Sequence, residues 1–116
     1  MGPAGRDFAN AAVLLSTALG PPALLGALKR LEAGFGRRAG RRWGQRVLDL
    51  DIILWSEGAW ASGGLSIPHA GMADRAFVLQ PLLAIAPAWR HPRRGLTVRH
   101  LHRRLTAPRP KPRGRA

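Results

Sequence analysis

The most informative stretch of this 116-residue sequence is Val47-Leu48-Asp49-Leu50-Asp51-Ile52-Ile53-Leu54. Successive side chains of a β-strand point to opposite faces, so the apolar residues at 48, 50, 52 and 54 would share one face. Asp49 and Asp51 would then lie side by side on the other face. Because the apolar run extends to Trp55, we predict a strand over residues 47–55 that buries its apolar face.

Two chemical interpretations fit the aspartate pair. Carboxylates on one face of a strand repel each other unless a cation lies between them, and hard oxygen ligands with room for water and phosphate suit Mg²⁺. Such a site would bind the metal only together with a phosphate ligand, because two carboxylates supply too few ligands alone. Alternatively, both acids face solvent or pair with arginines. The spacing is common, and by itself it favours this second interpretation.

The segment before the pair is glycine-rich and basic. Residues 36–46 are predicted to form a flexible loop, and its arginines are Arg37, Arg38, Arg41, Arg42 and Arg46. A guanidinium group matches phosphate oxygens in a planar fork. Arginines beside a cation site fit phosphoryl or diphosphoryl transfer, in which catalysis is chiefly positioning and charge neutralisation. In isolation, the same loop fits a solvated basic turn or an RNA contact equally well.

The remaining apolar pattern predicts separated helices and strands, which is typical of an α+β sandwich. In chain order these are a buried strand over 9–18, a helix that opens at Pro21 and ends at Gly34 and Gly36, a short strand over 65–67, a helix over 76–86 that is interrupted or entered at Pro81, and a short helix over 98–105.

The composition predicts one domain with a basic tail. Nineteen Lys and Arg against six Asp and Glu give a net charge of +13. Residues 1–89 account for +3 of it and residues 90–116 for +10. We predict a folded domain over residues 1–106 and a disordered tail over 107–116, whose alternative role is a weak, nonspecific grip on nucleic acid. The chain has no cysteine, which excludes disulfides and thiolate metal sites. No apolar run is long enough to span a bilayer and no signal peptide is evident, so we expect a cytoplasmic protein.

Three ordered blocks resemble one family, the 6-hydroxymethyl-7,8-dihydropterin pyrophosphokinases. The segment from Arg42 to Ile52 resembles the family's Arg-Trp-Gly-Pro-Arg-x-x-Asp-Leu-Asp-Ile, with Gln45 in place of proline. Ile67-Pro68-His69, then Arg75-x-Phe77-Val78-Leu79-x-Pro81-Leu82 and Ile85-Ala86-Pro87, match a second block in order and spacing. Phe8-x-Asn10-Ala11-Ala12 resembles the element on the pterin side. Together the blocks cover residues 7–87.

The resemblance implies a fold and a reaction. The fold would be a ferredoxin-like α/β sandwich with an antiparallel sheet, here without the family's N-terminal strand-helix-strand. The reaction would be transfer of diphosphate from ATP to 6-hydroxymethyl-7,8-dihydropterin in folate biosynthesis, with AMP as the other product. The protein would be a monomer without a membrane or a specific nucleic acid as partner. Two alternatives are a catalytically impaired fragment, whose activity an upstream extension would restore, and a basic nucleic-acid-binding protein.

The resemblance also implies a role for each matching residue. Asp49 and Asp51 would hold two Mg²⁺ ions together with ATP, and Arg46 and Arg37 would contact the transferring diphosphate. ATP would be contacted by His69, Arg75 and Glu32. The pterin would be held by Phe8, Asn10 and Phe77, and Trp43 would close the catalytic loop. Ordinary structural roles compete with these. His69 fits a loop histidine bonded to a carbonyl, the phenylalanines fit core aromatics, and Arg75 fits a surface pair with Asp74.

Overall fold

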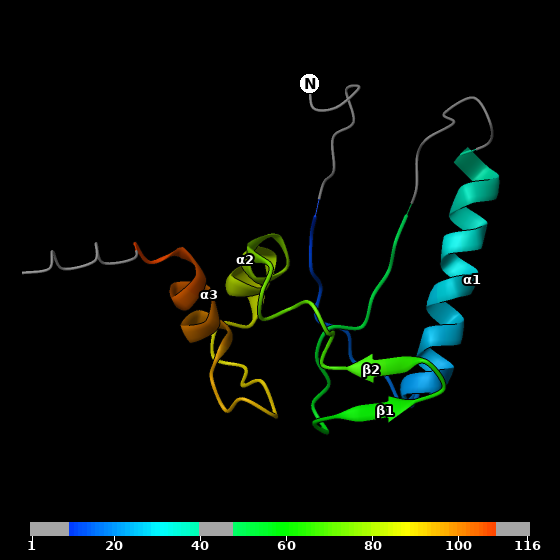
Figure 1. The fold of residues 1–116 in the computed structure, drawn as a ribbon. Helices are drawn as coiled ribbons and strands as arrows, with labels where there is room; N and C mark the ends of the chain where they lie inside the picture. Colours follow the sequence, from blue (N-terminus) through cyan, green and yellow to red (C-terminus); the bar gives the residue numbers. More distant parts are fainter. Residues whose placement is uncertain (1–9, 40–47, 109–116) are drawn as a thin grey trace, which may run out of the picture. The chain divides into compact units, whose positions relative to one another are not determined.

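The computed structural model describes residues 10–39 and 48–108, shown in colour in Figure 1. The described residues group into two compact units. One unit contains residues 15–39 and 48–70, and the other contains residues 10–14 and 71–108. We describe each unit by itself.

The first unit begins with helix α1, Pro21–Ala39. Proline is tolerated in the first turn, where its missing N–H has no intrahelical partner, so the predicted start is confirmed. The predicted end is wrong, because the helix continues through Gly34 and Gly36. A glycine inside a helix costs only about 1 kcal/mol relative to alanine and leaves the hydrogen-bond ladder intact. Two isolated glycines are therefore insufficient to end it.

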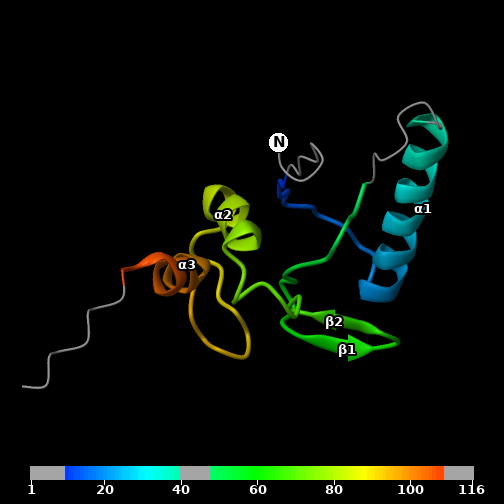
Figure 2. The ribbon, with the colours of Figure 1, turned by 45° about the horizontal axis from the view of Figure 1, so that its top comes forward.

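The described part of this unit also contains a two-stranded antiparallel hairpin (Figure 2). Strand β1, Trp60–Ser62, pairs with β2, Leu65–Ile67. The two residues between the strands, Gly63 and Gly64, have φ angles of 57° and 81°. Positive φ at both central positions is what a tight type I′ hairpin turn requires, and glycine adopts it without strain. The predicted strand over 65–67 is confirmed, whereas β1 was not predicted.

The predicted buried strand over 9–18 is wrong for the residues that the structure describes. Residues 10–18 have no strand assignment, and Val13, Leu14 and Leu15 are all more than half exposed. Among the described residues, the only hydrogen bond on this stretch is local, from Leu19 N–H to Thr17 Oγ1 at 3.0 Å. An apolar run becomes a strand only when a second strand pairs with it, and within the described residues no such ladder forms.

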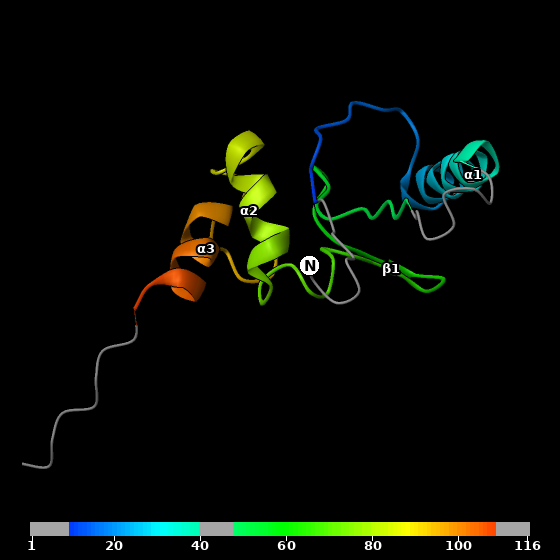
Figure 3. The same ribbon diagram turned by 90° about the horizontal axis from the view of Figure 1, so that it is seen from above.

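The second unit is a pair of packed helices (Figure 3). Helix α2 is Ala76–Ile85 and α3 is Val98–Thr106, so both predicted helices are confirmed to within one residue. Their core consists of apolar side chains with little or no exposure: Met72, Leu79, Leu82, Ala86, Val98 and Leu101. Thr97 caps the N-terminus of α3, because its Oγ1 accepts a hydrogen bond from His100 N–H at 3.1 Å.

Helix α2 neither begins nor breaks at Pro81, which lies inside it. Proline cannot donate to the carbonyl four residues earlier and costs a helix interior about 3 kcal/mol. Burial of Leu79 and Leu82 on the same helix contributes about 1.5–3 kcal/mol each. Tertiary packing therefore offsets the unfavourable residue.

The described residues form three helices and one two-stranded antiparallel sheet, which confirms the α+β class. Within the same ranges, no helix is both long and apolar enough to cross a membrane.

Candidate active site around Asp49 and Asp51

The segment that contains the aspartate pair is extended but is not a strand. Residues 48–54 have no strand assignment, so the predicted strand is wrong over its described part, apart from an isolated bridge between Trp55 and Gly58. Exposure nevertheless alternates, with Asp49 and Asp51 exposed and Leu48, Leu50 and Ile52 half-buried. The alternation agrees with an extended backbone whose two acids share the solvent side.

A side chain, not a neighbouring strand, binds the backbone between the two acids. Leu50 N–H donates to Glu32 Oε2 at 2.6 Å, although the residues are 18 positions apart. Glu32 lies on α1 and its side chain is only 17% exposed. Its other oxygen, Oε1, lies 3.3 Å from Lys29 Nζ one turn earlier. This carboxylate therefore attaches the aspartate segment to α1 and uses the N–H that a strand partner would need.

The same contacts perturb the titration of Glu32. The hydrogen bond from Leu50 N–H is the largest cause of a pKa lowered from the ordinary 4.5, and the Lys29 ammonium lowers the pKa further, while partial burial opposes both. A hydrogen bond to the charged form stabilises that form. Glu32 is therefore ionised at neutral pH, a third negative charge beside the aspartate segment.

His69 approaches the pair from the segment after β2. Its backbone N–H donates to Ile53 O at 2.9 Å, which places it alongside the aspartate segment. Its Nε2 lies 4.0 Å from Asp51 Oδ2, with the side chains 29% and 59% exposed respectively. The structure thus brings together Asp51 and His69, which are 18 residues apart, with both side chains open to solvent.

The donor set fits a cation that shares its ligands with a substrate. Among the described residues, no group of three or more His, Asp or Glu side chains is arranged to hold a metal ion. Asp49 and Asp51 offer exposed carboxylate oxygens, the ligands that Mg²⁺ prefers, and Mg²⁺ commonly takes one or two carboxylates together with substrate phosphates. The residues present therefore fit Mg²⁺ that arrives with a phosphate ligand.

Arg37 is on a helix and not in the predicted loop. It lies in the last turn of α1 with an exposed side chain, because the helix extends past Gly36. Phe8, Trp43 and Arg46 lie outside the described residues.

The other predicted residues belong to the second unit. Asn10 is exposed and Phe77, in the first turn of α2, is more than half exposed. Arg75 is the N-cap residue of α2. The ion pair between Arg75 and Asp74 that was considered as an alternative does not form. The side chain of Arg75 lies across Gly71: a Cβ placed on Gly71 would be 2.9 Å from both Cζ and Nε of Arg75. Gly71 thus leaves the space that this arginine occupies, a role that the sequence did not indicate.

We expect Gly71→Ala to displace Arg75 while leaving the fold intact. The added methyl group would lie too close to a flexible side chain, which can move away at little cost in stability. If Arg75 contacts ATP, the KM for ATP should rise about tenfold, the effect of weakening one charged hydrogen-bonding contact. Thermal unfolding and initial rates measure both effects. Gly20→Ala is the matched control, since nothing lies within 4 Å of its added Cβ. A large fall in Tm with unchanged KM would contradict the prediction.

We expect the hydrogen bond from Leu50 N–H to the Glu32 carboxylate to weaken when Glu32 is protonated in acid. A carboxyl group with a lowered folded-state pKa contributes stability that is fully present above its ordinary 4.5 and is lost as the pH falls through the lowered value. The amide proton signal of Leu50 should therefore titrate in NMR spectra below that pH. In Glu32→Gln the titration should be absent. A Leu50 signal that titrates equally in both proteins would show that another group causes the shift.

Comparison with known proteins identifies the family. The model of the 7,8-dihydro-6-hydroxymethylpterin-pyrophosphokinase (HPPK) family matches residues 2–87. A 2-amino-4-hydroxy-6-hydroxymethyldihydropteridine pyrophosphokinase of Synechocystis is 44% identical over 97 residues, 84% of this chain and 50% of the relative. The protein of the same name in Pseudomonas aeruginosa is 44% identical over 108 residues, 92% and 64% of the two chains. The chain thus spans about half to two thirds of these relatives' length. It belongs to the 7,8-dihydro-6-hydroxymethylpterin-pyrophosphokinase family.

Proposed function

We propose that the protein transfers diphosphate from ATP to 6-hydroxymethyl-7,8-dihydropterin, a step of folate synthesis. The observation that supports this best is the exposed pair Asp49 and Asp51. The hydrogen bond from Leu50 N–H to Glu32 attaches their segment to α1, and His69 Nε2 lies 4.0 Å from Asp51 Oδ2. The family membership and the names of the relatives point to the same reaction.

The reaction is a displacement at the β-phosphorus of ATP. The hydroxyl oxygen of the pterin alcohol forms the new bond to that phosphorus, the bond to the bridging oxygen between α- and β-phosphorus breaks, and AMP leaves with the bonding electron pair. The hydroxyl proton passes to solvent. Catalysis then consists chiefly of holding the two substrates in line and neutralising charge on the phosphates.

The aspartates and the histidine would act on the phosphate chain. Asp49 and Asp51 would hold two Mg²⁺ ions, which when bound neutralise charge on the phosphate oxygens. His69 would donate from its imidazole to an ATP phosphate oxygen. Glu32, for which the family resemblance implies a contact with ATP, would contribute mainly by accepting the hydrogen bond of Leu50 N–H and so fixing the backbone between the two acids.

The remaining assignments rest on the family resemblance. Arg37 and Arg46 would contact the transferring diphosphate, Arg75 would contact ATP, and Trp43 would close the loop over the site. The pterin would be held by Phe8, Asn10 and Phe77. We further propose a ferredoxin-like sandwich over residues 1–106, a monomer, and a cytoplasmic location.

The test is AMP release from Mg-ATP in the presence of the pterin alcohol. AMP and the pterin diphosphate should form in equal amounts. A 6-methyl analogue, which lacks the attacking hydroxyl group, should give no AMP. AMP release that is the same with either pterin, or with none, would show that the protein is not a pterin pyrophosphokinase.

A further inference from the structure

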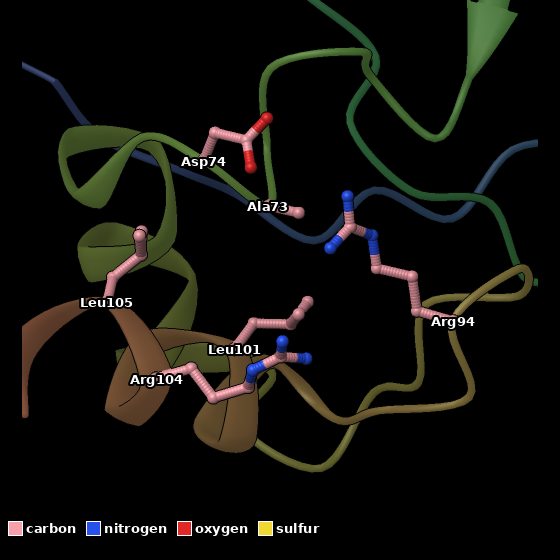
Figure 4. Close-up of a pocket in the computed structure, with 6 residues that line it drawn as sticks. All are labelled: Ala73, Asp74, Arg94, Leu101, Arg104 and Leu105. Carbon is pink, nitrogen blue, oxygen red and sulfur yellow. The ribbon is translucent and has the colours of Figure 1, made fainter.

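A small cavity in the second unit lies beside α3 and is not used by the proposed reaction (Figure 4). Its volume is about 150 Å³. The residues that line it are Ala73, Asp74, Arg94, Leu101, Arg104 and Leu105. A single water needs about 10–15 Å³ and a cavity of about 150 Å³ can hold benzene, so this cavity has room for a group the size of phosphate.

The cavity is lined by two guanidinium groups from different elements (Figure 4). Arg104 lies in the last turn of α3, and Arg94 lies in the loop that precedes this helix. Within residues 10–39 and 48–108, neither has an ion-pair partner within 4.0 Å. Asp74 is the only acid that lines the cavity, and no ion pair joins it to either arginine. The site therefore contains two unpaired positive charges above an apolar floor.

The loop that contains Arg94 is fixed by its own hydrogen bonds. The buried His91 accepts at Nδ1 from the backbone N–H groups of Arg93 and Arg94, both at 3.2 Å. Gly95 N–H donates to His91 O at 2.8 Å, and His91 N–H donates to Leu96 O at 2.8 Å. Burial, followed by the charges of Arg94 and Arg93, lowers the pKa of His91. The imidazole is therefore neutral at pH 7 and Nδ1 can accept both bonds, so the backbone of Arg94 is held in one place.

We infer that this cavity binds the phosphate group of a small anion, separately from the aspartate pair. Two guanidinium forks can each donate a pair of hydrogen bonds to tetrahedral phosphate oxygens. Leu105, which is 41% exposed, offers an apolar surface to the group that carries the phosphate. The negative charge of the Asp74 carboxylate opposes anion binding and limits the affinity for phosphate. Removing that charge should therefore raise the affinity if the anion binds in this cavity.

The experiment is a titration with inorganic phosphate at constant ionic strength, followed through the arginine Nε–H signals in NMR spectra. The signals of Arg94 and Arg104 should shift and saturate. R94Q and R104Q should each weaken the affinity about tenfold, as expected for loss of one charged, bidentate contact. R103Q is the matched control, since Arg103 neighbours Arg104 on the same helix and is also exposed, but does not line the cavity. D74N should tighten binding.

The outcome is independent of the proposed reaction. D51N should leave the phosphate affinity unchanged, and the titration needs neither ATP nor pterin. Shifts that do not saturate, or an equal loss in R103Q and R104Q, would overturn the inference and indicate a diffuse basic surface. Tighter binding of a single-stranded oligonucleotide that depends equally on all three arginines would overturn it as well.

Discussion

Replacing Asp51 with asparagine should lower the rate of pterin-dependent AMP formation by about 10²–10³-fold, the usual cost of removing one electrostatic contact from a transition state. Asp49→Asn should have an effect of the same size. Asparagine keeps the shape and the exposed position of the side chain but removes the negative charge that a cation requires. Initial rates of AMP release at saturating ATP and pterin alcohol measure the loss.

The same variants should separate metal binding from folding. We expect Mg²⁺ to bind measurably only with ATP, because within the described residues no group of three or more His, Asp or Glu side chains is arranged to hold a metal ion. Calorimetry of ATP binding with and without Mg²⁺ should show a metal-dependent gain in the wild type and none in Asp51→Asn. Glu57→Gln, which removes an exposed acid from the turn after Trp55, should behave as the wild type. Metal-dependent ATP binding that survives in both aspartate variants would rule out the assignment.

Leu79→Ala should destabilise the protein by about 2–5 kcal/mol, since removal of a buried side chain loses transfer free energy and leaves a cavity. Leu79 lies on α2 and is 0% exposed. Small proteins have a total free energy of unfolding of about 5–15 kcal/mol, so a large share of the stability would be lost. Urea unfolding followed by circular dichroism measures the change.

An exposed leucine provides the comparison for this effect. Leu31 lies on α1 and its side chain is 55% exposed. Leu31→Ala should change the free energy of unfolding by at most about 0.5 kcal/mol. If the two substitutions cost the same, the second unit does not have the helix-to-helix core that we describe.

The helices could be predicted from the sequence because their signals are local. Pro21 marks the start of α1, and the apolar spacing over 76–86 and 98–105 gave α2 and α3 to within one residue. Within the described residues, the strands predicted over 9–18 and 47–55 were wrong for the opposite reason. Apolar alternation shows only that a segment could pair, and pairing needs a second segment that the sequence does not point to. A local signal for β1 was present in Gly63-Gly64, the dipeptide of a tight hairpin turn.

The candidate site was predictable in part. The spacing of Asp49 and Asp51 correctly placed both on the exposed side of an extended segment. The contact between Glu32 and Leu50 and the approach of His69 to Asp51 each join residues 18 positions apart. Such contacts depend on how α1 and the hairpin fold back along the chain. The space that Gly71 leaves for Arg75 likewise depends on three-dimensional proximity. Hydrophobic periodicity does not indicate which glycine lies against a neighbouring side chain.

The aromatic pair beside the hairpin gives the first unit an optical signature. The rings of Trp55 and Trp60 meet edge to face, with centroids 6.0 Å apart and planes at 77°. Two indoles at this separation couple their electronic transitions, and the resulting circular dichroism depends on their fixed mutual angle. The signal should vanish when the first unit unfolds, whereas the part of the far-ultraviolet signal that comes from α2 and α3 need not be lost at the same time. One denaturation experiment read at two wavelengths can therefore show whether the two units unfold together.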